Sequence, residues 1–393
     1  MIYKSMQLFP AHGQIREECV IGLENELEGI TVISVEQAVA GPYCGMLLAD
    51  AGARVIKVER PGGDFARIYD RWADGDSAIF IWLNRGKQSI CLDMKSDADM
   101  ALLGRMIEKA DVLLSNLAPG AMERYGLTGE ILRQKNPGLI TCMLSGYGRD
   151  GKAGRKKAYD FLVQAESGVV AVTGTPEEPV RVGISMTDLS TGLTAFSAIL
   201  RALHQRARTG KGVDLQVNMF DVMTDWMNMA LLGYRYSDVP PQRYGLTHGF
   251  VAPYGAYHTK DGRQVMLSIQ NDREWKDFCL QVLQQPELVE DRRYKHNPER
   301  YKNRVALAEI INQAFAAYDK DVIIDMLEET RIACASLNSV EEVSEHQFLQ
   351  NRKVQMGDKI IDIADLPVRR ANGSVTRAPV LDEDGAKIRE EFN

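Results

Sequence analysis

Asp188 stands in a sequence setting that suits a nucleophilic or proton-carrying carboxylate. Apolar residues after it recur at three- and four-residue steps, which predicts an amphipathic helix that Gly210 ends. These residues are Leu193, Phe196, Ile199, Leu200 and Leu203. We therefore expect Asp188 at or next to the N-cap, where helix N–H groups favour the ionised carboxylate. Spacing alone favours a plain cap, so the rest of the chain must decide whether Asp188 does chemistry.

Short β-rich segments alternate with helical segments from about residue 29. The expected strands are 30–35, 54–58, 89–92, 111–115 and 139–144, and the clearest helices are 38–50 and 98–109. This alternation predicts an α/β fold with a doubly wound, largely parallel, Rossmann-like sheet. Ligands of such sheets bind at the carboxyl ends of the strands.

The character of the sequence changes after the Asp188 helix. We predict a large α/β domain over residues 1–224, a linker over 225–245 and a small α+β domain over 246–330. A hairpin with an Asp261-Gly262 turn opens the small domain. Residues 331–393 are expected to return and pack on the large domain, although periodicity gives no elements for the last forty residues.

Composition indicates an ordinary globular protein, with 45% hydrophobic and 26% charged residues among 393. The net charge of −7 gives no reason to expect a nucleic acid or an anionic membrane as a partner. The N-terminus lacks the apolar core of a secretory signal, and no run of about 20 apolar residues exists. The six cysteines are scattered, which predicts reduced thiols in a cytoplasmic protein. They are Cys19, Cys44, Cys91, Cys142, Cys279 and Cys334.

Several common site motifs are missing. The chain has no GxGxxG fingerprint, no Walker A loop and no GxSxG elbow, and its six histidines form no metal-binding spacing. We therefore predict no metal site. The turn at Ala40-Gly41 permits either close approach of a phosphate or adenine, or tight helix packing. Arg60 and Lys95, both just past strands, are the best candidates to bind a polyphosphate, although solvated surface charge is the usual role of such residues.

An ordered series of short motifs runs through the chain. The motifs are Ala40-Gly41-Pro42, Val55–Asp64, Leu83–Ile90, Leu92–Lys95, Asn116–Gly120, Ser145–Gly148, Lys157–Asp160 and Thr209–Gly212. The series resembles the family III CoA-transferases, which include formyl-CoA transferase, carnitine CoA-transferase and α-methylacyl-CoA racemase. The resemblance covers roughly residues 29 to 280.

The resemblance implies a CoA-transferase in which Asp188 is the nucleophile and Asp160 is an acidic residue near the active site. It implies an aspartyl-CoA thioester intermediate, an acyl-CoA donor, a carboxylic acid acceptor and an interlocked homodimer. CoA is then a substrate, and no cofactor is bound permanently. The residues implied to line the CoA site are Ala40, Arg60, Leu92, Lys95, Asn116, Leu117, Arg124, Lys157 and Met219.

Departures from the family pattern narrow the activity. Racemase relatives have a histidine where this chain has Tyr159 and a glutamate near Gln270-Asn271, so a racemase or isomerase with Asp188 and Asp160 as proton carriers is the weaker alternative. Oxalate-specific members have a run of glycines where this chain has Tyr244–Phe250. The segment Ala378–Gly385 also departs from the family's usual ending.

Two segments of the chain bear on the identity of the acceptor acid. The Lys157–Asp160 and Asn271–Trp275 segments resemble the branch that handles small dicarboxylates such as succinate, itaconate, mesaconate or malate. Arg243 and His248 are candidates to hold the distal carboxylate of such an acid. A non-catalytic, CoA-binding subunit of a heteromer is a further alternative.

Overall fold

The computed structural model describes residues 25–149, 151–237, 241–368 and 375–393. Contacts divide the chain into two compact units. Unit 1 takes its described residues from 25–36, 44–114 and 350–393, and unit 2 consists of 37–43 and 115–349. This division differs from the domain boundaries predicted above, which stay a prediction.

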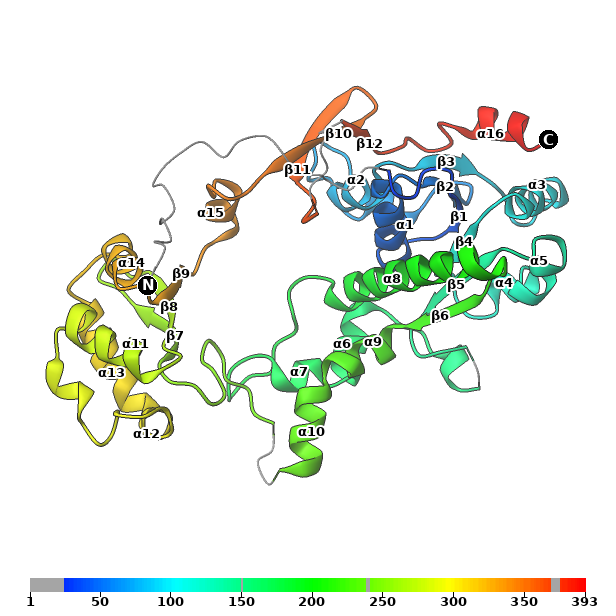
Figure 1. The fold of residues 1–393 in the computed structure, drawn as a ribbon. Coiled ribbons are helices and arrows are strands. Elements are labelled where there is room, and N and C mark those ends of the chain that lie inside the picture. Colours follow the sequence, from blue (N-terminus) through cyan, green and yellow to red (C-terminus); the bar gives the residue numbers. More distant parts are fainter. Residues whose placement is uncertain (1–24, 150, 238–240, 369–374) are drawn as a thin grey trace, which may run out of the picture. The chain divides into compact units, whose positions relative to one another are not determined.

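The larger sheet has six strands in the order β3-β2-β1-β4-β5-β6 (Figure 1). The strands are β1 (Thr31–Val35), β2 (Arg54–Glu59), β3 (Gln88–Cys91), β4 (Val112–Ser115), β5 (Ile140–Ser145) and β6 (Asp214–Asn218). Most of their residues are buried on both faces, as in a parallel sheet covered by helices. The order is that of doubly wound dinucleotide-binding sheets, so the α/β prediction with a large parallel sheet is confirmed. Strand β6 was not among the expected strands.

Helices follow most of these strands. They are α1 (Ala40–Asp50), α2 (Ala78–Asn84), α3 (Asp97–Glu108), α4 (Ala121–Arg124), α5 (Gly129–Lys135), α6 (Asp160–Glu166), α7 (Val169–Val172), α8 (Met186–Thr209), α9 (Met219–Trp226) and α10 (Asn228–Tyr236). The longest, α8, lies along β5 and β6 (Figure 1). It ends at Gly210, as predicted, because that residue adopts the left-handed conformation with φ 70°.

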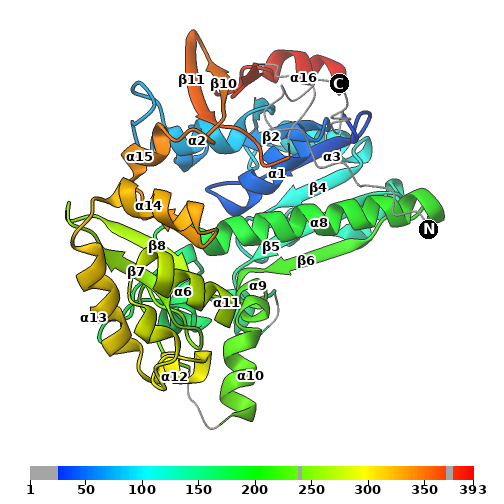
Figure 2. The same ribbon diagram turned by 60° about the vertical axis from the view of Figure 1, so that its left-hand side comes forward.

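Two three-stranded sheets accompany the large one in the described residues, one in each unit. The sheet of unit 2 has three antiparallel strands (Figure 2). They are β7 (Tyr254–His258), β8 (Gln264–Ser268) and β9 (Ala333–Ser336). Its helices include α11 (Asp272–Asp277), α12 (Asn297–Lys302), α13 (Arg304–Phe315) and α14 (Lys320–Glu329). Trp275, Phe278 and Phe315 lie in its buried core. The predicted hairpin is confirmed, and β9 lies beyond the predicted end of the small domain at residue 330.

The segments that the sequence left without elements are partly regular. The region expected as a linker contains α10, and Val340–Ser344 forms α15. In unit 1, β10 (Asn351–Met356) and β11 (Lys359–Ala364) form a hairpin, followed by β12 (Thr376–Arg377) and α16 (Gly385–Glu391). The backbone N–H of Ser89 donates to Asp384 Oδ2 at 3.0 Å, and Arg54 pairs with Glu391 at 2.6 Å. The end of the chain therefore contacts β2 and β3.

Candidate active site

Asn116 joins two segments at the point where the strand order of the sheet reverses. It follows β4, and its side-chain Oδ1 accepts the N–H of Gln37, just after β1, at 2.8 Å. Its Nδ2 donates to the carbonyl of Gln37 at 2.7 Å. This reversal is where doubly wound sheets bind ligands. The two hydrogen bonds between Asn116 and Gln37 fix the backbone three residues before Ala40. Sequence reasoning missed Gln37, although its position just after β1 could have indicated it.

Ala40 begins α1 and lies against α8. A Cβ atom built on Gly192 of α8 would be only 2.6 Å from the carbonyl oxygen of Ala40 and 3.1 Å from Tyr43 Cβ. Only glycine permits this close approach of the two backbones. Gly192 follows Asp188 by four residues and so lies on the same helix face one turn later. The structure therefore brings Ala40 and the start of α8 together, and sequence reasoning missed Gly192.

The prediction that Asp188 lies at or next to the N-cap is wrong, because α8 begins earlier than the apolar periodicity indicates: Ser185 is the N-cap, and Asp188 is the third residue of the helix. The side chain that accepts from the first-turn amides is Asp160, the first residue of α6. Its Oδ1 accepts the N–H of Thr187 at 2.7 Å and the N–H of Asp188 at 3.2 Å. The two acidic residues implied by the resemblance are thus brought together across 28 residues of sequence.

The expectation that the helix end keeps Asp188 ionised is wrong. Burial, and secondarily the charge of Asp160, raise the pKa of Asp188 to about 7. Asp160 occupies the amides that were expected to stabilise Asp188, and it adds a like charge beside it. The Asp188 carboxyl therefore titrates near neutral pH.

The other predicted residues of unit 2 have different surroundings. Leu117 lines a shallow surface recess together with Pro119 and Met143. Arg124 is exposed at the end of α4, and Lys157 is exposed in the loop before α6. Met219 begins α9 and is buried.

Arg60, Leu92 and Lys95 belong to unit 1. Arg60 is exposed and its Nε donates to the carbonyl of Gly63 at 3.0 Å, which leaves its terminal nitrogens outside that bond. Leu92 is buried, and Lys95 is exposed in the turn before α3.

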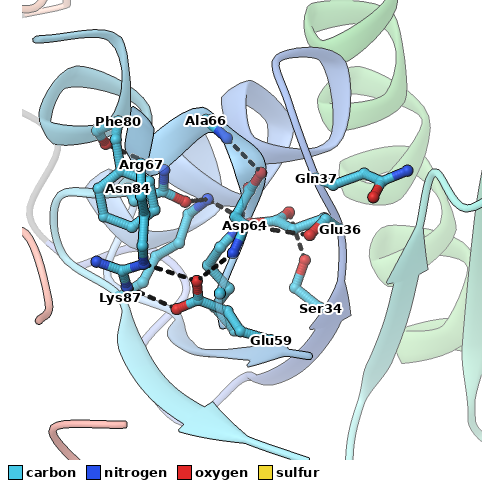
Figure 3. A network of polar contacts seen from close by, with 12 residues as sticks. Ser34, Glu36, Gln37, Glu59, Asp64, Ala66, Arg67, Phe80, Asn84 and Lys87 are labelled. Atoms are coloured by element: carbon cyan, nitrogen blue, oxygen red, sulfur yellow. Dashed lines mark hydrogen bonds and ion pairs between the residues drawn. The ribbon is translucent and has the colours of Figure 1, made fainter. Parts of the chain in front are cut away.

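The loop that carries Arg60 is held by a buried charge network (Figure 3). The Glu59 carboxylate accepts the N–H of Asp64 at 2.9 Å and two bonds from the Arg67 guanidinium at 2.8 and 2.7 Å. Asp64 in turn pairs with Lys57 at 2.9 Å. Burial opposes the charge of Glu59, but Arg67 and Lys57 lower its pKa to about 2. Both ends of the Arg60 loop are therefore fixed.

Arg243 does not have a free guanidinium. Its nitrogens donate to the carbonyls of Thr175 at 2.7 Å, Pro176 at 2.8 Å and Ala171 at 3.3 Å. His248 stacks on Tyr254 with ring centroids 4.8 Å apart. Arg243 thus holds the loop after α7, because its three guanidinium nitrogens all donate to backbone carbonyls of α7 and of that loop.

Within residues 25–149, 151–237, 241–368 and 375–393, no group of three or more His, Cys, Asp or Glu side chains is arranged to hold a metal ion. In the same ranges, no helix combines the length and apolar character that a membrane span requires.

Comparisons with known proteins agree on one family. The sequence profile described as CoA-transferase family III matches residues 27–384. The chain is 35% identical to the acetyl-CoA:oxalate CoA-transferase of Acetobacter aceti, over 93% of this chain and 95% of that protein. It is 34% identical to the succinyl-CoA:glutarate CoA-transferase of Mus musculus, over 83% of this chain and 75% of that protein. A CAIB/BAIF family protein from Brucella suis has a similar structure, with a TM-score of 0.82, 31% identity and coverage of 93% of this chain and 99% of that one.

Proposed function

The chain belongs to CoA-transferase family III and is a CoA-transferase, and from this premise we propose that Asp188 is its nucleophile. The observation that carries the proposal is the setting of Asp188: a partly buried carboxyl in the first turn of α8, beside Asp160 and one turn before the contact with Ala40. A carboxylate nucleophile divides one difficult acyl exchange into covalent steps.

The reaction has four balanced steps. The Asp188 carboxylate attacks the thioester carbonyl of the donor, which forms a mixed anhydride and releases CoA thiolate. The thiolate attacks the aspartyl carbonyl, which forms the Asp188–CoA thioester and releases the donor acid. The acceptor carboxylate attacks this thioester, which forms a second mixed anhydride, between Asp188 and the acceptor, and again releases CoA thiolate. The thiolate then attacks the acyl carbonyl of the acceptor, which gives the new acyl-CoA and regenerates Asp188.

The raised pKa of Asp188 suits the first step of this cycle, in which Asp188 attacks the donor. At neutral pH an ionised fraction is present for the attack, and the pKa of about 7 indicates a carboxylate that is poorly stabilised by its surroundings. A carboxylate that is not held by strong hydrogen bonds is easier to convert to an anhydride. Asp160 holds the helix turn instead, through the N–H groups of Thr187 and Asp188.

We propose the remaining predicted residues as the CoA site. Arg60, Lys95, Arg124 and Lys157 are exposed and suit the 3′-phosphate and pyrophosphate of CoA. Asn116 acts through the Gln37 backbone that it binds. The apolar part of the site is assigned to Ala40, Leu92, Leu117 and Met219.

We propose a small dicarboxylate as the acceptor, of the size of succinate, itaconate, mesaconate or malate. Both relatives compared above are named for a dicarboxylate, oxalate in one case and glutarate in the other, which supports the class. The segment Tyr244–Phe250 lacks the run of glycines of oxalate-specific members, so oxalate is not the favoured acceptor. A panel of these acids, including oxalate and glutarate, tests the assignment by the mass of the new acyl-CoA.

We propose a homodimer in the cytoplasm, interlocked as the resemblance implies. Exposed large apolar side chains on α9 and α10 support a protein partner for this surface. The free cysteines of the described chain, Cys44, Cys91, Cys142, Cys279 and Cys334, suit a reducing compartment. Cys19 lies outside the described residues.

An acyl-CoA isomerase is the second candidate function. A carboxyl group that titrates near neutral pH also suits proton transfer, with Asp188 and Asp160 as the carriers. The chain has Tyr159 where racemases have a histidine, which counts against it. An isomerase exchanges the α-proton of its substrate with deuterium oxide and forms no covalent CoA adduct.

Trapping the intermediate tests the proposed function. The purified protein is incubated with acetyl-CoA or succinyl-CoA, digested, and the peptide that contains Asp188 is weighed. We expect the mass of CoA less water on this peptide, and Asp188→Asn should lower the transfer rate by roughly a thousandfold or more. Asp321→Asn is the matched control, because Asp321 is also in the first turn of a helix but its side chain is 88% exposed.

Three results would count against the proposal. Full activity of Asp188→Asn excludes Asp188 as the nucleophile. Deuterium exchange without an adduct favours the isomerase. No activity of the purified chain with any acid, together with activity on addition of a second protein, indicates a subunit of a heteromer.

A further inference from the structure

Gln164 is a buried amide that connects Asp160 to the segment before the Asp188 helix. It lies one turn after Asp160 on α6 and is 0% exposed. Its Nε2 donates to Asp160 Oδ2 at 2.7 Å. Its Oε1 accepts the backbone N–H of Val182 at 3.0 Å. Both ends of the Gln164 amide are thus used.

These bonds fasten the loop 183–185 on both sides. Gln164 holds Val182 before the loop, and Asp160 holds the N–H groups of Thr187 and Asp188 after it. The loop itself is partly exposed, with Ile184 at 64%. A short exposed loop held by buried hydrogen bonds at each end has little freedom to move, so the first turn of α8 is held in place.

We propose that Gln164 is a positioning residue for CoA transfer: it orients the Asp160 carboxylate, which in turn holds the backbone of Asp188. The proposal rests on the proposed role of Asp188 as the nucleophile. Gln164 does not touch the reacting atoms in this scheme. It acts through Asp160 and through the backbone of Val182, and the geometry that it maintains is the direction of the Asp188 carboxyl.

The hydrogen-bond pattern makes the proposal testable by exchange of the two side chains. In Asp160→Asn, the amide nitrogen of the new asparagine faces Gln164 Nε2, so two donors meet. If the Gln164 amide rotates to avoid this, its nitrogen faces the N–H of Val182, and two donors meet there instead. In Gln164→Glu, two carboxylates face each other and cannot both stay ionised.

The double variant, Asp160→Asn with Gln164→Glu, restores a matching partner for every donor. The amide nitrogen of the new asparagine donates to one oxygen of the new glutamate, whose other oxygen accepts the N–H of Val182. The side-chain oxygen of the asparagine accepts the N–H groups of Thr187 and Asp188, as the aspartate does in the wild type. These shorter bonds are then complementary again, and only the long bond from Gln164 Nε2 to the Val182 carbonyl, at 3.5 Å, is lost.

The experiment measures the single-turnover rate at which the Asp188 peptide gains CoA from acetyl-CoA or succinyl-CoA. Each single variant should be roughly 10- to 100-fold slower, the loss expected for one hydrogen bond to a charged group. The double variant should regain most of this rate, with the KM for the donor little changed throughout. Gln205→Glu, the same change at an exposed position of α8, is the matched control and should have the wild-type rate.

Thermal unfolding of each variant separates misfolding from misplacement of Asp188. If Gln164→Glu does not fold, comparison of Asp160→Asn with the double variant decides the same question. A double variant that is no faster than the slower single variant, or that does not fold, contradicts the proposal, because complementary bonds should restore both packing and rate. Unchanged rates in the single variants also contradict it. The comparison of variants is meaningful only if the wild-type protein forms the Asp188–CoA adduct. If the wild-type protein forms no adduct, the proposed function is overturned, not the role of Gln164.

Discussion

At the scale of single residues, the charge of Asp188 depends on a residue far away in the sequence. Spacing predicted both the helix and the place of Asp188 near its start, because apolar periodicity and Gly210 are local signals. The same reasoning gave the wrong charge state. Burial and the charge of Asp160 raise the pKa of Asp188, while Asp160 also occupies the helix amides. The sequence of residues 182–210 contains no signal for the hydrogen bonds to Asp160.

The raised pKa predicts how the rate depends on pH. Attack requires the ionised form, so the rate of Asp188–CoA formation should rise with pH through a midpoint near the pKa of about 7. Asp160→Asn removes the like charge, which eases ionisation of Asp188, so the midpoint should move to lower pH. It should stay above the pKa of an ordinary Asp, because burial is the larger cause and remains.

Single-turnover rates across the neutral pH range check this prediction. The midpoint of the pH profile is compared, not the maximum rate, because Asp160→Asn also lowers the maximum rate by breaking the hydrogen bond with Gln164. Asp321→Asn, on the surface of α14, should leave the midpoint in place. A midpoint that stays the same or rises in Asp160→Asn would show that Asp160 does not act on Asp188 through its charge.

At the scale of elements, the sequence revealed the buried strands and missed the exposed ones. Strands β1, β2 and β5 are runs of buried, mostly apolar residues, and such runs are recognisable without a partner. Strand β6 is an edge strand with a single buried residue, and β11 has none, so neither is a continuous run of buried residues. These strands are defined by pairing with a neighbour, which a local pattern does not contain.

The face of α8 that packs was also predicted only in part. Leu193 is 48% exposed, whereas small residues on another face are buried. The buried residues of α8 are Thr187, Ser190, Thr191, Gly192, Ala195, Ile199 and Ala202. Small side chains allow a close approach to another backbone but give a weak apolar signal, so periodicity emphasised the leucines instead.

Gly192→Ala tests this close approach. The added methyl group would meet the Ala40 carbonyl at 2.6 Å, so one of the two backbones must move. We expect a loss of about 1–3 kcal/mol in the free energy of unfolding and a slower formation of the Asp188–CoA adduct, because Ala40 packs against the face of α8 that carries Asp188. Urea unfolding and single-turnover kinetics measure the two effects.

Gly104→Ala is the matched control for this change. Gly104 lies inside α3, and no atom is within 4 Å of its added methyl group. The substitution should be neutral or stabilise the protein by up to about 1 kcal/mol, as alanine does in an open helix position. Equal stability of the two variants would mean that α1 moves away from α8 without cost.

At the scale of the whole molecule, the surface of α9 and α10 is unlike that of an isolated chain. Five large apolar side chains in a stretch of eleven residues are at least half exposed. They are Trp226 at 54%, Met229 at 79%, Leu232 at 50%, Tyr234 at 70% and Tyr236 at 82%. Exposed apolar groups of this density support the proposed homodimer, in which a second copy of the chain would cover them. Aromatic and methionine side chains are also those enriched in protein interfaces.

Met229→Glu tests whether this surface is the dimer interface. A charge placed in a covered apolar contact is costly, so the variant should dimerise at least roughly tenfold more weakly or be recovered as a monomer. Sedimentation velocity over a concentration series measures this. Val305→Glu is the matched control, because Val305 is 71% exposed on α13 and lies outside this stretch. If Met229→Glu and wild type have the same sedimentation coefficient at every concentration, the α9–α10 surface is not the contact between the two copies.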